Sequence, residues 1–153
     1  MKKMNERPQN FIDFCQRRFG VDEKLWESYS IIVSNRSVYI EAVGLAVAPD
    51  WQTIGRGFRA ARRTSRSFKP GNRFLQWLDD KITKNKIELS TSEFESVLER
   101  KKIVTGDKPH SRGYVALFYK KIVVGCGFWS GEDLRTQISK GVSREFPRQE
   151  LKT

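Results

Sequence analysis

A dense group of positively charged side chains lies in the middle of the chain with no acid among them. Seven cations and no Asp or Glu occur between positions 56 and 73, namely Arg56, Arg59, Arg62, Arg63, Arg66, Lys69 and Arg73. A solvated surface normally intersperses charges of both signs. Arginines gathered on one surface attract a phosphate backbone, and their planar guanidinium groups fit phosphate and stack on unpaired bases. The stretch predicts nucleic-acid binding; the alternative is a basic face that only keeps the protein soluble.

The excess of positive charge marks the whole chain of 153 residues. It has 29 Lys and Arg against 18 Asp and Glu, a formal net charge of +11, and 38% of its residues are hydrophobic. That apolar fraction supplies a core and argues against a mainly disordered chain, and the length fits one domain or two small ones. The positive charge is therefore expected on a folded surface.

Residue types that carry metal or nucleophilic chemistry are sparse. The chain has one histidine, His110, in a polar loop, and its two cysteines, Cys15 and Cys126, lie far apart inside apolar patterns. A metal site needs a cluster of His, Cys or carboxylates, and the nucleophile elbow G-x-S-x-G is absent. The cysteines are interpreted as buried, reduced thiols. We expect no metal, no cofactor and no catalytic residue.

Residues 55–60, Gly-Arg-Gly-Phe-Arg-Ala, formally match the dinucleotide-binding pattern G-x-G-x-x-G/A. That pattern binds a nucleotide only where a buried parallel strand precedes it and a helix N-terminus follows. The preceding residues 49–53, Pro-Asp-Trp-Gln-Thr, are too polar for a buried strand. We interpret the two glycines as a bend in a sheet.

No stretch of the sequence resembles a membrane span or a secretory signal. A spanning helix needs about 18 or more consecutive apolar residues, and the best apolar run here, residues 122–128, is far shorter. Residues 1–9 are charged and polar, without the apolar segment of a signal peptide. We expect a cytoplasmic protein with no membrane partner.

The first half of the chain predicts two helices around a hairpin. Phe11, Phe14, Cys15 and Phe19 recur at helical spacing before Gly20, which is placed to end the helix. Residues 29–33 and 37–43 are rich in β-branched and aromatic residues and predict a β-hairpin. Pro70 can open a further helix, which would bury Phe74, Leu75, Trp77, Leu78 and Ile82.

The second half predicts a short helix and a strong hairpin. Ser90 and Glu93 have the spacing of a capping box at a helix start, and Ser92 with Glu95 offers a second register. Residues 113–119 and 122–129 are two apolar runs around Lys-Lys, which leaves the turn type open. Gly125 and Gly127 share one face, where the strand can bend or another backbone can approach.

The C-terminal third resembles a known RNA-binding family. Residues 113–120, residues 123–128, Leu134-Arg135 and Ser139-Lys140 resemble the C-terminal PUA-type domain of the Sun-family RNA 5-methylcytosine methyltransferases. Residues 86–90 are similar to the entry strand of that domain. Upstream, Tyr39, residues 54–58 and the basic stretch resemble the α/β module that precedes a PUA domain in a ribosome-assembly factor family.

The resemblance implies a small mixed pseudobarrel that binds structured RNA, matched here at Gly113, Gly125, Gly127 and Lys140. The chain departs from those methyltransferases at Gln137, where they tend to carry Asn, and at Ser139, where they tend to carry Pro. It also lacks their Cys-Pro pair and the length of their cofactor domain. It resembles a targeting module without its catalytic domain.

We therefore expect an α+β protein with a small N-terminal α/β module at residues 1–85 and a PUA-like mixed β pseudobarrel at residues 86–153. The expected function is non-catalytic binding of structured rRNA or tRNA in ribosome biogenesis or RNA modification. The predicted RNA-binding residues, expected on one surface across both modules, are Arg56, Arg59, Arg62, Arg63, Arg66, Lys69, Arg73, Arg112, Arg135, Lys140 and Arg144.

Two alternatives to independent RNA binding stay open. In the first, the chain is the RNA-recognition subunit of a methyltransferase complex whose catalytic chain is separate. In the second, it is a module whose positive surface binds an acidic protein. A separate RNA methyltransferase or a ribosome-assembly protein is accordingly the further partner expected besides RNA.

Overall fold

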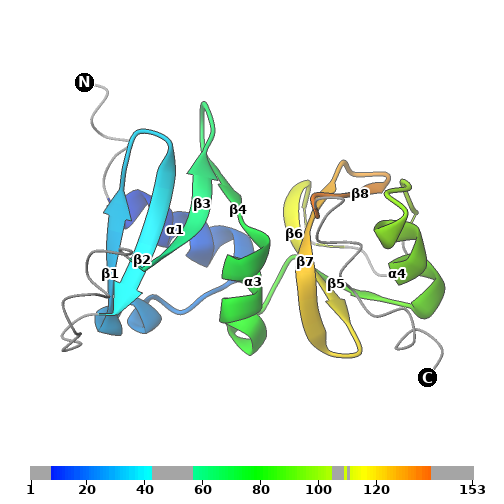
Figure 1. Cartoon of the computed structure of the whole chain (residues 1–153), viewed down its shortest axis with the longest axis horizontal. Coiled ribbons are helices and arrows are strands. Elements are labelled where there is room, and N and C mark those ends of the chain that lie inside the picture. The colour runs from blue at the N-terminus through cyan, green and yellow to red at the C-terminus, as the bar shows by residue number, and fades with distance from the viewer. Residues whose placement is uncertain (1–7, 43–56, 105–108, 110, 139–153) are drawn as a thin grey trace.

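Two four-stranded sheets and the helices that cover them make up the described part of the chain, residues 8–42, 57–104, 109 and 111–138 of a computed structural model (Figure 1). The first sheet is antiparallel and has the order β1 (Tyr29–Val33), β2 (Ser37–Ala42), β3 (Phe58–Arg63), β4 (Phe68–Pro70). The second sheet has the order β5 (Lys86–Leu89), β6 (Gly113–Tyr119), β7 (Ile122–Trp129), β8 (Leu134–Thr136), with β5 parallel to β6. The α+β class is confirmed, and the described strands do not close into a barrel.

Helix α1 (Pro8–Phe19) is the amphipathic helix that the sequence predicts. Its residues Phe11, Phe14, Cys15 and Phe19 are all buried. Gly20 ends it at φ +67°, where a side chain would clash with the hydroxyl of Thr83. No helix among the described residues is long and apolar enough to cross a membrane.

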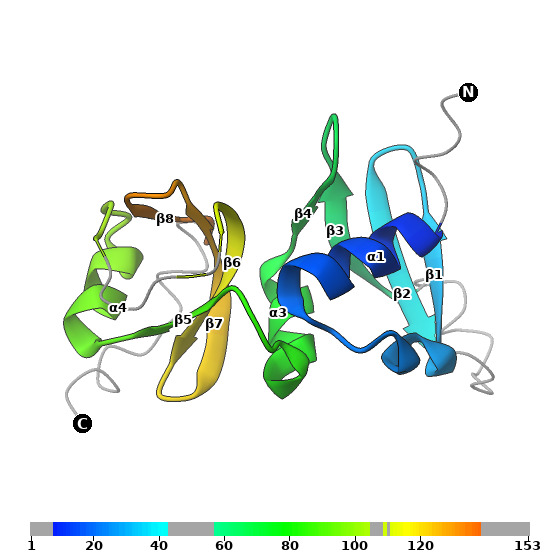
Figure 2. The ribbon, with the colours of Figure 1, turned by 180° about the vertical axis from the view of Figure 1, so that it is seen from behind.

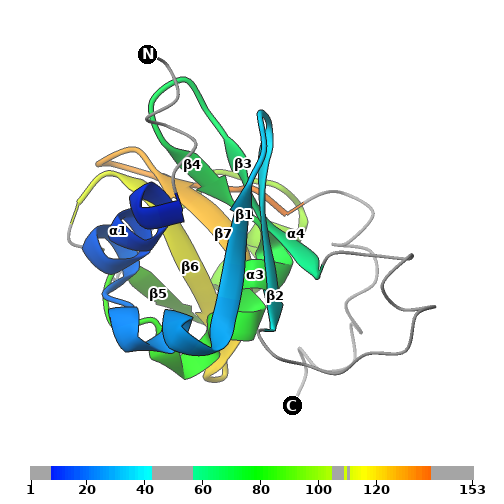
Figure 3. The ribbon, with the colours of Figure 1, turned by 90° about the vertical axis from the view of Figure 1, so that its left-hand side faces the viewer.

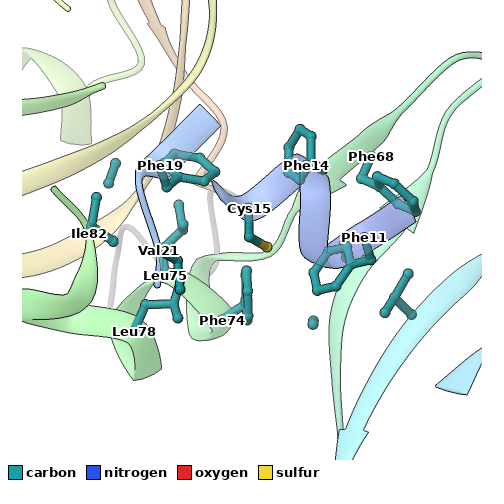
Figure 4. Packing of buried hydrophobic residues seen from close by; sticks show 14 of the residues in the cluster. Phe11, Phe14, Cys15, Phe19, Val21, Phe68, Phe74, Leu75, Leu78 and Ile82 are labelled. Carbon is teal, nitrogen blue, oxygen red and sulfur yellow. The ribbon is translucent and has the colours of Figure 1, made fainter. Parts of the chain in front are cut away.

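Helix α3 (Asn72–Leu78) lies between the two sheets (Figure 1). α1 crosses one face of the first sheet (Figure 2), and the second sheet lies behind the first when the molecule is viewed from the β1 end (Figure 3). The ring of Phe11 lies 5.2 Å from that of Phe68 and 5.4 Å from that of Phe74 (Figure 4). Ala116, Phe118, Val123 and Cys126 of the second sheet belong to the same cluster. One core therefore joins both sheets.

The helix predicted from Pro70 begins two residues later than expected. Pro70 is the last residue of β4, paired with Ala61, and α3 starts at Asn72. An edge strand accepts proline because its outward side needs no N–H donor. Phe74, Leu75 and Leu78 are buried as predicted, and Ile82 is buried beyond the short 3₁₀ turn η3 (Asp79–Lys81).

The second sheet is apolar on both faces. Ala116 and Phe118 face the core shared with α1 and α3, whereas Val115, Leu117 and Tyr119 face a second cluster with α4 (Thr91–Leu98). This explains why β6 and β7 are continuous apolar runs in the sequence instead of alternating patterns.

Two local alternatives of the sequence are decided by the structure. α4 uses the Ser90 and Glu93 capping box, in which the Ser90 N–H donates to the Glu93 carboxylate at 2.8 Å and the Glu93 N–H to the Ser90 hydroxyl at 3.2 Å. In the β6–β7 turn, Lys120 and Lys121 both have positive φ, 53° and 68°. Two central residues with positive φ characterise a type I′ turn, whose twist matches that of the strands.

Gly125 and Gly127 are buried beneath side chains. A Cβ on Gly125 would lie 2.6 Å from Ile138 Cγ1 and 2.8 Å from Asn72 Oδ1, and one on Gly127 would lie 2.9 Å from Leu134 Cδ1. The sequence predicts a bend of the strand or the close approach of another backbone at these two glycines. In the structure, side chains of the protein itself pack against both of them, so this part of β7 is not open to a ligand.

The predicted boundary between residues 85 and 86 falls where β5 begins. Asn85 is only 3% exposed; its amide donates to the Arg18 carbonyl at 2.6 Å and accepts from the Ser111 N–H at 3.2 Å. The division into two modules stays a prediction, because the core and this hydrogen-bonded residue connect both sides of it.

Asn72 fastens α3 to the second sheet, and its loss should destabilise the fold. Its Oδ1 accepts a hydrogen bond of 2.7 Å from the main-chain N–H of buried Cys126. Asn72→Ala leaves that donor without a partner, so the free energy of unfolding should fall by about 1–3 kcal/mol. Gln76→Ala, which removes a weaker 3.5 Å bond to the Val124 carbonyl, is the control. Equal losses in urea denaturation of the two variants would contradict this role of Asn72.

The two free cysteines should resist alkylation in the folded protein. Burial raises the pKa of Cys126 to about 12, against the opposing effect of Lys69 and Arg18, and burial also raises the pKa of Cys15. Both thiols thus stay protonated at about pH 8, and the thiolate is the reactive form. Mass spectrometry should find no iodoacetamide adduct on the native protein and two adducts in denaturant. Rapid native labelling of either cysteine would show that the shared core is open.

Candidate nucleic-acid interface

The β3–β4 hairpin carries five of the predicted RNA-binding residues, Arg59, Arg62, Arg63, Arg66 and Lys69. In the ladder, Arg62 lies opposite Lys69 and Arg63 opposite Phe68. The connecting residues are held by a hydrogen bond of 2.9 Å from the Thr64 N–H to the Ser67 carbonyl and another of 2.9 Å from the Ser67 N–H to the Thr64 hydroxyl. Residues 58–70 of the basic stretch thus form a hairpin.

A β-bulge puts Arg59 and Arg62 on the same face of this hairpin. Residues three apart in a regular strand point to opposite faces. Here Val38 pairs with Ala61 and Tyr39 with Arg59, so Ala60 is an extra residue in β3. Ala60 and Ala61 are both buried, whereas Arg59 and Arg62 are both exposed. The bulge therefore reorients one arginine to lie beside the other.

Arg59, Arg62 and Lys69 line a hollow of about 320 Å³ together with Ala61, Pro70, Gly71, Asn72 and Gln137. We call it the inter-sheet hollow, because Gln137 follows β8 of the second sheet while the three cations belong to the first. No acidic residue of the described part of the chain lines it. Among the described residues, ion pairs join Lys101 to Glu99 and Arg135 to Asp133, and none involves these three cations.

Arg63 and Arg66 belong to a different hollow of about 260 Å³, which faces α1. We call it the helix-side hollow; it is lined by Asn10, Asp13, Arg17, Arg63, Thr64, Arg66, Ser67 and Phe68. Arg63 donates to the Ser34 carbonyl at 2.8 Å. Asp13 supplies a negative charge that the basic stretch itself lacks. The five cations of the hairpin therefore line two separate hollows.

Three other predicted residues, Arg73, Arg112 and Arg135, line neither hollow. Arg73 is exposed on α3, and Arg135 is exposed on β8, with its Nε 3.8 Å from Asp133 Oδ1. Arg112 is exposed, and its main-chain carbonyl is held by Arg18. Arg56, Lys140 and Arg144 lie outside the described residues. One continuous surface across both halves stays a prediction.

Arg18, in the last turn of α1, anchors the segment before β6. Its guanidinium donates to the Ser111 hydroxyl at 2.6 Å, the Ser111 carbonyl at 2.9 Å, the Arg112 carbonyl at 3.0 Å and the Tyr114 carbonyl at 2.6 Å. Burial lowers its pKa. These bonds fix the backbone that carries Arg112 without using a carboxylate.

Sequence reasoning missed Asn72, Gln137 and Arg17 as lining residues. Arg17 could have been found from its position in the basic last turn of α1. Asn72 lies inside the basic stretch, but it is uncharged, and the prediction there rested on positive charge alone. Gln137 was noted only as a departure from the methyltransferase pattern, and nothing in its neighbours places it beside a hairpin some seventy residues earlier.

The described part of the chain contains no arrangement of residues typical of a metal site or of a dinucleotide-binding site. No group of three or more His, Cys, Asp and Glu residues gathers there as a metal site would. The glycine pattern at residues 55–60 leads into β3, an antiparallel strand, whereas a dinucleotide site needs a helix at that point. Gly57 adopts φ +81°, and a side chain there would clash with the Ile40 carbonyl.

Comparison of the chain with family models and with curated proteins identifies no relative. No family model matches the chain, and no curated protein matches it either. The geometry of the two hollows and the resemblance at residues 86–140 are therefore the grounds on which a function can be argued.

Proposed function

We propose that this chain is a non-catalytic, cytoplasmic RNA-binding protein that recognises structured rRNA or tRNA in ribosome biogenesis or RNA modification. One observation supports the proposal most: Arg59, Arg62 and Lys69 of the β3–β4 hairpin line one hollow, to which the described residues contribute no acid. The helix-side hollow adds Arg17, Arg63 and Arg66 on the other side of the same hairpin. The hairpin thus presents cations on two sides, and a folded RNA could contact both.

The energetics favour a polymer with phosphate at regular intervals. Exposed cations that have no ion-pair partner gain most from a phosphate backbone, which releases its condensed counterions when they bind. Side chains cannot read the deep, narrow major groove of A-form RNA. Specificity would therefore come from RNA shape and from unpaired bases.

A PUA-like domain is part of this proposal. It rests on the resemblance at residues 86–140 and on the mixed sheet β5 to β8, in which a parallel pair precedes an antiparallel hairpin. In this view the second sheet and α4 form a compact support, and the β3–β4 hairpin together with Gln137 faces the RNA.

The alternative is that the chain is the RNA-recognition subunit of a methyltransferase complex. The resemblance of residues 113–128 to a domain of those enzymes, in a chain without their Cys-Pro pair, favours it. Copurification of a methyltransferase from cells would support the subunit role, whereas RNA binding by the chain alone with no such enzyme attached would favour independent action.

Neutralising the inter-sheet hollow should lower both RNA affinity and its salt dependence. The variant Arg59→Gln/Arg62→Gln/Lys69→Gln removes up to three phosphate contacts, so the slope of log K against log salt should become shallower by about 2 to 3. Fluorescence anisotropy with structured rRNA and tRNA fragments across a salt series measures this slope.

The matched control is Lys24→Gln/Lys81→Gln/Lys102→Gln, which removes the same charge from three exposed lysines that line neither hollow. It should retain most of the slope. Equal slopes for both triple variants would refute this site, and an RNA affinity of the unmodified protein no higher than that for an acidic polypeptide would refute RNA binding itself.

A further inference from the structure

We propose that the inter-sheet hollow is a discrete binding site for one phosphate group of a nucleotide. Arg59, Arg62 and Lys69 would contact its oxygens, and the amides of Asn72 and Gln137 would border it. The inference rests on the proposed function and deepens it, because it replaces general attraction to a polyanion by a single site with defined ligands.

The size of the hollow fits such a ligand. Its volume of about 320 Å³ corresponds to roughly ten water molecules at their volume in the liquid. It lies near the lower end of the range for small-molecule sites. A phosphate and part of the attached nucleoside can therefore enter, whereas a whole base-paired helix cannot.

The unpaired positive charges of the site favour the binding of an anion. Arg62 and Lys69 lie directly opposite each other on antiparallel strands, and like charges at such positions repel. The bulge at Ala60 brings Arg59 to the same side, which adds a third positive charge. None of the three has an ion-pair partner among the described residues. A phosphate between them turns this repulsion into attraction, and arginine suits it because its fork matches two phosphate oxygens.

The side-chain amides of Asn72 and Gln137 add hydrogen-bonding groups to the three positive charges of the hollow. The Cys126 N–H can only donate, so the hydrogen bond of 2.7 Å fixes the carbonyl oxygen of Asn72 toward β7. Within the described part of the chain, the Nδ2 group of Asn72 is left as the free donor of a residue that lines the hollow. Gln137 is fixed through its main chain, whose N–H donates to the Cys126 carbonyl at 2.9 Å. Because Gln137 also lines the hollow, we assign its side-chain amide as the second directional group.

The helix-side hollow is the weaker candidate for the same ligand. It contains Arg63 and Arg66, but Asp13 lines it too. Asp13 accepts a hydrogen bond of 2.9 Å from Gln9, which leaves its negative charge in place to repel phosphate. Arg63 thus provides a matched control, because it lies on the same strand as Arg62 and lines the other hollow.

Three sources share the phosphate chemistry: free inorganic phosphate, a terminal nucleotide and an internal phosphodiester. The probes are therefore inorganic phosphate, a nucleoside 5′-monophosphate and a dinucleotide with one internal phosphate, with the unphosphorylated nucleoside as the blank. Each is titrated into the full chain at constant ionic strength, and the side-chain amide NMR signals of Asn72 and Gln137 are followed.

The expected result is saturable movement of both amide signals with phosphorylated probes and none with the nucleoside. Arg62→Gln should weaken this binding by about tenfold or more, as removal of a charged hydrogen-bond donor does, and Arg63→Gln should leave it within about twofold. Gln137→Ala, which retains its main-chain bond to Cys126, should weaken the nucleotide more than inorganic phosphate. The probe that binds most tightly identifies the source.

Two results would overturn the inference: amide signals that do not saturate, or equal weakening by Arg62→Gln and Arg63→Gln. RNA binding measured on the same proteins separates this inference from the proposed function. RNA binding with its full salt slope, while phosphate leaves the amides unmoved, refutes the phosphate site alone. Saturable phosphate binding without RNA binding supports the site and refutes the RNA function, and the ligand is then a small phosphorylated molecule.

Discussion

The β6–β7 hairpin is apolar on both faces, and each face has to be covered by a different part of the chain. Phe118 and Cys126 pack into the core with α1 and α3, while Leu117 and Val115 pack beneath α4. Burial of apolar surface is the dominant favourable contribution to folding, so this hairpin holds the first sheet, its helices and α4 in one stack. The positions of α3 and α4 on opposite faces of the second sheet follow from that requirement.

The stack creates the candidate site as a consequence. α3 lies against β7 through the Asn72 bond to Cys126, and that contact brings the β3–β4 hairpin beside the end of β8. Gln137 then lines the same hollow as Arg59, Arg62 and Lys69. A site at such a junction depends on the packing of both sheets, so changes in the core at Cys126 or Asn72 would alter ligand binding without touching a cation.

Periodicity and capping made most elements predictable. The spacing of Phe11, Phe14 and Phe19, the two hairpins and the capping box at Ser90 are short-range signals, and the structure contains each of them. The start of α3 differed because Pro70 satisfies an edge strand as well as a helix start. The face of Arg59 was not predictable, since the bulge at Ala60 arises from pairing with β2 and has no signature in its own neighbours.

Crosslinking of the protein to RNA by ultraviolet light, followed by mass spectrometry of the attached peptides, tests the central claim most directly. The account predicts that nucleotide-bearing peptides come from the β3–β4 hairpin and from the peptide that contains Gln137. Crosslinks confined to the exposed side of α4, far from Arg59 and Arg62, or the absence of any crosslink with RNA in excess, would contradict it.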